Sequence, residues 1–292
     1  MNVTLSELIN ESSQLVSPPD VWVKINELVQ NENSSAADMA DVIQHDPGLT
    51  ANILKVVNSA YYNLARQVDT VSRAIAIIGT NDLYNLATAL TAARVFSNIP
   101  CHLTSPDIFW RHSIATGILA RKLAKHCSVI GSERLYVAGL LHDIGSLLIY
   151  SRMPELSSEV LMMANGDEEV LYQAENDIIG FNHATVSAEL LRLWNLPENL
   201  VITVAHHHEP MRAESNIVDA AIVCIANHVV NRFSGSAFVE DPGENLLALD
   251  PRVWEVTNLN EQIIDELMID HEQDLAVALS VMLPSTSIAE HS

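Results

Sequence analysis

The chain has 292 residues, of which 48% are hydrophobic, and this composition excludes an intrinsically disordered protein. Its formal net charge is −22. A surface this acidic repels phosphate backbones and anionic lipid headgroups, which argues against a protein that binds nucleic acid or a membrane. The N-terminal residues lack the basic and apolar regions of a secretory signal, and no apolar run of about 18 residues predicts a transmembrane helix.

Glycine and proline are sparse, with 10 and 11 residues, while alanine and leucine are frequent. This balance favours helices over strands and predicts an all-α fold, a multi-helix bundle with an N-terminal helical lobe. The chain has three cysteines, Cys101, Cys127 and Cys224, and none of them belongs to a Cys-x-x-Cys pair. We therefore expect reduced thiols in a cytoplasmic protein.

Residues 1–100 are expected to form the N-terminal lobe. Hydrophobic periodicity predicts helices over residues 3–16, 21–30, 36–44 and 81–96, and a further helix that begins at Asp46-Pro47. Gly79 is expected to end a helix. No residue of this lobe suggests catalysis, so we interpret it as a packing or partner surface.

Residues 101–233 are expected to form a helical core. The pattern predicts helices over residues 107–126, 133–152, 182–194 and 215–233, and another that starts at Pro197 and runs to a group of three histidines. Residues 234–243 are expected to form a loop. Residues 234–292 form a C-terminal extension, whose helices are expected to pack on the core or to make a contact between copies of the chain.

The dipeptide His142-Asp143 lies in the apolar run Leu-Leu-His-Asp-Ile-Gly, in the middle of the helix predicted over 133–152. A buried, unpaired carboxylate is very costly, so Asp143 needs a metal, a cation or several hydrogen-bond donors. Neighbouring side chains on a helix diverge by about 100°. Both residues can therefore reach one ion only where other helices close around them.

Further histidines are His112, His183 and the run His206-His207-His208. Each has an ordinary explanation: a core or surface histidine for His112, a helix cap for His183, and a surface run for the three together. Imidazoles and a carboxylate gathered in one helical protein are also the ligands of a divalent transition metal. Their order along the chain is the specific signal.

That order resembles the HD superfamily of metal-dependent phosphohydrolases, and three N-terminal segments narrow the resemblance to the HDOD family, the HD-related output domain of bacterial signalling. These segments are His45-Asp46-Pro47-Gly48-Leu49-Thr50, Val56-Val57-Asn58-Ser59-Ala60 and Ala74-Ile75-Ala76-Ile77-Ile78-Gly79. Trp194-Asn195-Leu196-Pro197 and His207-His208-Glu209-Pro210 belong to the same pattern. The resemblance covers residues 15 to 232 and implies an all-helical fold with an HD-like core.

The resemblance implies one or two metal ions. It places His112, His142 and Asp143 at a first ion and His183, His207 and His208 at a second, with Asp143 bridging and serving catalysis. The histidine-rich set favours Fe, Mn, Ni or Zn over Mg or Ca.

The chain departs from the catalytic members of the superfamily at three places. Asn227 stands where the superfamily has an aspartate ligand, so the first ion would have Asp143 as its single anionic ligand. Ser146 stands where the phosphodiesterase relatives have a lysine, and their Gly-Tyr-Pro signature is absent after the paired histidines. Arg111 could supply a cation to a phosphate, although a salt bridge explains it more simply.

Two functions remain open. The departures favour a bacterial signal-transduction module with a degenerate metal site, which acts through a protein partner or a small phosphorylated ligand. The retention of every histidine favours the alternative, an active metal-dependent phosphohydrolase that cleaves a nucleotide or a cyclic dinucleotide.

Overall fold

The computed structural model describes residues 3–59, 62, 64, 66–237 and 248–282. Within these residues the fold is built from helices, with no strand, as the composition predicts. The predictions for residues 238–243 of the loop and for 283–292 of the extension lie outside the described residues. The first nine helices are α1 (Leu5–Ser12), α2 (Asp20–Gln30), α3 (Ala36–Gln44), α4 (Pro47–Val57), α5 (Val71–Ile78), α6 (Thr80–Phe96), α7 (Pro106–His126), α8 (Glu133–Leu141) and α9 (Ile144–Arg152). The later ones are α10 (Pro154–Ala164), α11 (Glu168–Ala174), the π-helix η1 (Glu175–Ile179), α12 (His183–Leu193), α13 (Glu198–Ala205), α14 (Ile217–Ser234), α15 (Pro251–Thr257), α16 (Glu261–Met268) and α17 (His271–Met282).

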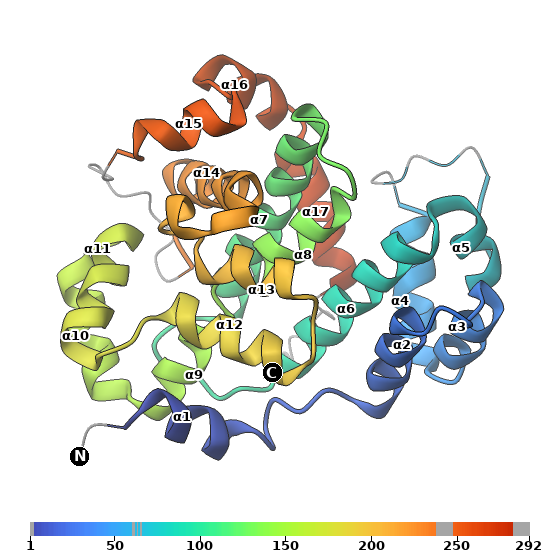
Figure 1. Cartoon of the computed structure of the whole chain (residues 1–292), viewed down its shortest axis with the longest axis horizontal. Helices are drawn as coiled ribbons and strands as arrows, with labels where there is room; N and C mark the ends of the chain where they lie inside the picture. The colour runs from blue at the N-terminus through green and yellow to red at the C-terminus, as the bar shows by residue number, and fades with distance from the viewer. Residues whose placement is uncertain (1–2, 60–61, 63, 65, 238–247, 283–292) are drawn as a thin grey trace, which may run out of the picture.

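Helices α2 to α5 lie together at one end of the molecule, and α6 leads from them into the larger body (Figure 1). In that body α7, α8 and α14 pack against one another, and α12 and α13 pack beside them. Helix α1 packs on α9 and α12 of the larger body, although it precedes the lobe in the chain. The C-terminal helices α15 and α17 pack on α14 and α7, respectively.

An aromatic cluster joins the N-terminal lobe to the larger body. The ring of Trp194 lies 5.0 Å from that of Trp22 and 5.6 Å from that of Phe96. The Trp194 indole N–H donates to the carbonyl of Val16 at 2.6 Å. Trp194 therefore lies where the N-terminal lobe meets the helices that carry the histidines.

Two close helix contacts depend on glycine. A Cβ on Gly139 of α8 would lie 2.7 Å from the Cα of Gly117 on α7, and a Cβ on Gly145 of α9 would lie 2.3 Å from the carbonyl oxygen of His183 on α12. Real Cβ atoms essentially never approach so closely, so only glycine permits these crossings. The crossings bring the chain at residues 142–143 within reach of the histidine-bearing helices.

The continuous helix predicted over 133–152 is wrong, because α8 ends at Leu141 and α9 starts at Ile144. Asp143 has φ −105° and ψ 4°, outside the helical region. The His142 ring hydrogen-bonds through Nδ1 to the carbonyl of Gly139 at 2.7 Å, in place of a backbone donor. The freed N–H of Gly145 donates to the Ser187 hydroxyl on α12 at 2.9 Å. Contacts with the ring and with a neighbouring helix thus stabilise a break that local helix propensity does not indicate.

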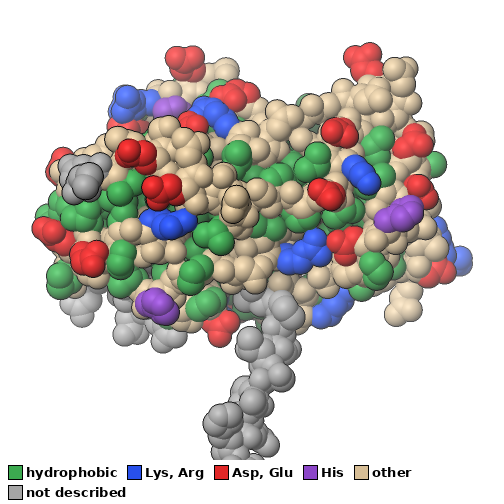
Figure 2. Space-filling model, turned by 90° about the horizontal axis from the view of Figure 1, so that it is seen from below, with side chains coloured by type: hydrophobic (Ala, Val, Ile, Leu, Met, Phe, Trp, Pro, Cys, Tyr) green, Lys and Arg blue, Asp and Glu red, His purple; other side chains and the backbone are tan. Residues whose placement is uncertain are grey.

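One described helical segment, Glu214–Ser234, is long and apolar enough to cross a membrane by length and composition. Two-thirds of the 18-residue window that meets this test is buried inside the protein. The segment includes the central helix α14, so we interpret it as a core helix. On the face shown in Figure 2, acidic and basic side chains are interspersed among hydrophobic ones rather than gathered into a basic surface.

Candidate metal centre

The predicted histidine and aspartate ligands come from four parts of the chain and meet in one buried region. His112 lies in the second turn of α7, and His142 and Asp143 form the break between α8 and α9. His183 is the first residue of α12, and His207 and His208 follow the end of α13. Five of these six residues are at most 3% exposed, and the side chain of His208 is 6% exposed. His206 lies outside the groups, so only two members of the histidine run take part.

The first group contains His112, His142, Asp143 and Glu168, whose ligand atoms all lie within 4.8 Å of one another. Oδ2 of Asp143 is 3.0 Å from Nε2 of His142 and 3.7 Å from Nε2 of His112. Oε1 of Glu168 is 3.7 Å from Nε2 of His112. Two imidazoles and two carboxylates thus surround one point.

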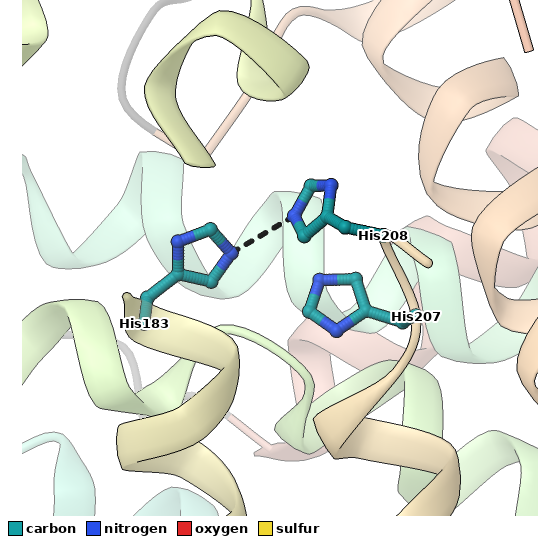
Figure 3. Close-up of side chains that lie close together, drawn as sticks. All are labelled: His183, His207 and His208. Carbon is teal, nitrogen blue, oxygen red and sulfur yellow. Dashed lines mark hydrogen bonds between the residues drawn. The ribbon is translucent and has the colours of Figure 1, made fainter. Parts of the chain in front are cut away.

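The second group contains His183, His207 and His208 (Figure 3). Nε2 of His183 and Nε2 of His208 are 3.0 Å apart. Oδ1 of Asp143 is 3.3 Å from Nε2 of His183 and 3.7 Å from Nε2 of His207. Asp143 therefore faces the first group with one oxygen and the second group with the other.

The buried acceptors of the two groups have no hydrogen-bond partner among the described residues. The orphaned atoms are both carboxylate oxygens of Asp143, Oε1 of Glu168, and Nε2 of His112, His142 and His207. In His142 and His207, Nδ1 bonds to a backbone carbonyl at 2.7 Å, which leaves the lone pair on Nε2. Orphaned buried acceptors are costly, and a cation satisfies all of them at once. The donor set therefore fits a divalent metal.

The protonation states of Asp143, His207 and His208 also suit a metal. Burial alone would raise the pKa of Asp143, but the neighbouring His142, His183 and His207 hold it well below its usual value. Burial, reinforced by neighbouring histidines, lowers the pKa of His207 and of His208 well below the usual value. Asp143 is thus an anion and these two rings are neutral near pH 7, the forms that bind metal.

The sequence did not indicate two buried carboxylates of this region. Glu168, at the start of α11, is 5% exposed, and Glu175, at the start of the π-helix η1, is fully buried. Glu168 stands in Asp167-Glu168-Glu169, which reads as the acidic first turn of an exposed helix. This corrects the expectation that Asp143 is the single anionic residue at the first ion, because Glu168 places a second carboxylate in the first group.

Asn227, on α14, lies against Glu168. Its Nδ2 donates to Oε2 of Glu168 at 2.6 Å, and its Oδ1 accepts from Nδ2 of Asn231 at 3.3 Å. The amide thus orients the carboxylate of the first group. Arg111 pairs with Glu272 at 2.9 Å on the surface, which confirms the simpler explanation of that residue.

A cavity of about 260 Å³ opens beside both groups. It is lined by Asp167, Glu168, Glu169, His207, His208, Cys224, Asn227, His228, Asn231, Ala248, Leu249, Asp250 and Val253. No lysine or arginine is among these described lining residues. The cavity gives a small molecule a route to the candidate metal ligands.

Solved structures share this fold. An HDOD domain protein of unknown function from Geobacter sulfurreducens aligns with a TM-score of 0.76 and 22% identity, over 96% of this chain and 98% of that one. A protein from Shewanella amazonensis SB2B, described as a candidate phosphohydrolase, aligns with a TM-score of 0.72 and 21% identity, over 93% and 96% of the two chains.

An uncharacterized protein of Treponema pallidum (strain Nichols) is 27% identical over 253 residues, which are 84% of this chain and 47% of that protein. The chain thus spans about half the length of this relative. The HDOD domain family matches residues 15–210, more than half of the chain. These residues, together with the fold and the order of the histidines along it, make the chain a member of the HDOD domain family.

Proposed function

We propose that this chain is a signalling module that binds a divalent transition metal at the two groups and, in the adjoining cavity, a small phosphorylated ligand. The observation that carries the proposal is the set of orphaned, buried acceptor atoms that face one another. The module would then signal the binding of this ligand to a protein partner. The three free cysteines support a cytoplasmic location.

The two groups offer different donor sets, and both would hold a divalent transition metal. The first group combines two imidazoles with two carboxylates, and the second offers three imidazoles beside the shared Asp143. Such nitrogen-rich sets favour Fe, Mn, Ni or Zn over Mg or Ca. A bound ion of this kind supplies a Lewis acid for a phosphoryl oxygen.

The lining of the cavity supports ligand binding over turnover. No described lining residue is a lysine or arginine that would stabilise the charge developing on a phosphoryl group. Ser146, which stands where catalytic relatives have a lysine, is fully buried. The described lining of this cavity therefore lacks the cations that phosphoryl transfer uses beside the metal.

One observation favours the second candidate, a metal-dependent phosphohydrolase. Glu168 supplies the first group with a second carboxylate that the sequence pattern did not indicate. Two anionic ligands hold a cation more firmly than one. Hydrolysis of a phosphoester at this site would require His112, His142 and Asp143 to be intact.

Metal content and turnover, measured together on purified protein, test both candidates. We expect near-stoichiometric transition metal in the wild type, its loss in His142→Ala, and its retention in His206→Ala, a neighbouring histidine outside both groups. A protein that cannot be loaded with metal refutes both functions. Turnover of nucleotides or cyclic dinucleotides that disappears in His142→Ala establishes the phosphohydrolase and refutes the binding module.

A further inference from the structure

The three imidazoles of the second group differ in what fixes their orientation. Nδ1 of His207 bonds to a backbone carbonyl at 2.7 Å, and Nδ1 of His183 donates to Oε2 of Glu175 at 2.6 Å. Nδ1 of His208 makes only a 3.4 Å contact with Oε2 of Glu169, which is long for a hydrogen bond. Because a bond at the far nitrogen orients a metal-binding imidazole, His208 needs another support.

A tyrosine ring lies flat against His208. The rings of Tyr172 and His208 are stacked, with centroids 4.7 Å apart and an angle of 25° between their planes. Tyr172 also meets the ring of His183 edge-on, at 6.3 Å between centroids. His183 and His208 are the two rings whose Nε2 atoms lie 3.0 Å apart (Figure 3). Tyr172 therefore packs beside both members of this pair.

Hydrogen bonds fix Tyr172 itself. Its hydroxyl donates to Oε2 of Glu209 at 2.8 Å, and the same oxygen accepts from a guanidinium N–H of Arg212 at 2.8 Å. Its backbone carbonyl accepts from Nδ2 of Asn176 at 3.0 Å. Glu209 directly follows His208 in the chain. Two consecutive residues thus contact the same tyrosine, one at the ring face and one at the hydroxyl.

The helix that carries Tyr172 also supplies the first group. Glu168 lies four residues earlier on α11, so both side chains lie on the same face of that helix. An imidazole that binds a metal becomes electron-poor, and the face of a tyrosine ring attracts such a group. The stack is therefore suited to the metal-bound form of His208.

We propose that Tyr172 is a positioning residue for the ion of the second group, because its stacked ring keeps Nε2 of His208 directed at that ion. The inference rests on the proposed function, since it requires metal at this group. Loss of a contact that supports a ligand weakens metal affinity by about 10- to 100-fold while every ligand remains in the chain.

Titration of the full chain with Zn²⁺ against a competing chelator tests this. His112→Ala removes a residue of the first group and His207→Ala one of the second, so these two variants assign the binding steps of the wild type to the two groups. Tyr172→Leu should weaken the step of the second group by about tenfold or more and leave the step of the first group unchanged. That unchanged step also shows that the variant is folded.

Tyr172→Phe keeps the stacked ring and loses the hydroxyl, so it should restore the affinity of the second group. Tyr84→Leu is the matched control for the loss of a tyrosine. Tyr84 lies on α6, donates through its hydroxyl to Asn26 at 2.7 Å and belongs to neither group. This control should bind both ions as the wild type does. If Tyr172→Leu does not fold, Tyr172→Met, which fills more of the space without an aromatic face, takes its place.

The outcomes separate this inference from the proposed function. A folded Tyr172→Leu variant that binds the second ion as tightly as the wild type overturns the inference. A Tyr172→Phe variant as weak as Tyr172→Leu overturns it too, since the hydroxyl and not the stack would then matter. A wild type with a single ion, lost in His112→Ala and kept in His207→Ala, overturns the inference and leaves the first group as the metal site. Absence of all metal uptake overturns the proposed function and this inference together.

Discussion

Glu175 holds His183 by two hydrogen bonds to one carboxylate oxygen. Oε2 accepts from the backbone N–H of His183 at 2.8 Å and from Nδ1 of its ring at 2.6 Å. Burial alone would lower the pKa of His183, but the Glu175 carboxylate raises it to about 9. Since the pKa of His208 is lowered well below its usual value, the proton on Nε2 of His183 donates to Nε2 of His208 at 3.0 Å.

The first prediction concerns the proton that a metal must displace from His183. At pH 7.5, below the raised pKa of about 9, the wild-type ring is protonated, so metal bound at Nε2 releases that proton. Glu175→Gln removes the largest of the charges that raise the pKa of His183, so we expect the ring to be neutral in the variant. Calorimetric titration in buffers of different ionisation enthalpy should show about one proton fewer released by the variant.

Glu189→Gln is the control, because Glu189 pairs with Arg192 on the surface, away from the metal groups. It should release as many protons as the wild type. Metal affinity of the wild type should also rise between pH 7 and 9, more steeply than that of Glu175→Gln. Equal proton release by the wild type and Glu175→Gln would show that Glu175 does not hold the proton on His183.

The second prediction concerns Asn227, whose Nδ2 is 2.6 Å from Oε2 of Glu168. Asn227→Asp replaces that donor with a second carboxylate oxygen, and two buried like charges repel unless a cation lies between them. We expect the metal-free variant to lose about 1–3 kcal/mol in the free energy of unfolding. Metal should restore more stability to the variant than to the wild type, as measured by urea unfolding with and without chelator.

Asn33→Asp adds the same charge at an exposed position, away from Glu168. It should change neither the stability in chelator nor the stability gained from metal. If Asn227→Asp is as stable as the wild type in chelator and gains no more from metal, Asn227 and Glu168 do not interact as the structure indicates.

The third prediction concerns the crossing of α9 and α12. In Gly145→Ala the new Cβ would lie 2.3 Å from the carbonyl oxygen of His183 and 2.6 Å from the backbone nitrogen of Ser187, so the two helices must separate. We expect a loss of about 3 kcal/mol in the free energy of unfolding, near the upper end of the usual cost of overpacking. Metal affinity should fall as well, because His183 moves away from Asp143.

Gly48→Ala provides the comparison, since its Cβ would make only an ordinary 3.4 Å contact with Asp46. It should fold and bind metal as the wild type does. Wild-type stability in Gly145→Ala would contradict the close crossing.

The sequence predicted the helical fold and most helices, because apolar periodicity and caps such as Asp46 are local signals. The side chain of Asp46 does accept from the backbone N–H of Leu49 at the start of α4, as expected of a cap. The order of the histidines along the chain was enough to group them. The distances between them could not be predicted, because they depend on helix crossings such as that of Gly117 and Gly139, which no local pattern reveals.

The break at His142-Asp143 and the role of Glu168 could not be predicted for a different reason. The run Leu-Leu-His-Asp-Ile-Gly is compatible with a helix, and the break is stabilised by Ser187, 42 residues further along the chain. Glu168 has the sequence context of a solvated residue, and only the folded chain places it against Asn227. Tertiary contacts override local propensity at both places.

The last prediction concerns His271, at the start of α17, which packs on α7. The side chain is fully buried, and neither ring nitrogen has a hydrogen-bond partner among the described residues. Burial lowers its pKa to about 4, assisted by Lys122 and Arg111 and opposed by Glu272 and Asp274. The unfolded chain, in which the histidine pKa is about 6.5, therefore binds the proton more readily than the folded one. The stability that this neutral ring permits is fully present above pH 6.5 and is lost as the pH falls from 6.5 towards 4.

Between pH 8 and pH 5 this one group should cost the wild type about 2 kcal/mol in the free energy of unfolding. His271→Leu removes the titration and fills the apolar site, so its unfolding free energy should fall by about 2 kcal/mol less over the same interval. Urea unfolding at the two pH values measures the difference. His126→Leu is the matched control, because His126 is exposed at the end of α7, the helix on which α17 packs, and it should follow the wild-type pH dependence. If His271→Leu loses as much stability between pH 8 and pH 5 as the wild type does, His271 is protonated equally in both states, and the contact of α17 with α7 does not exclude water from the ring.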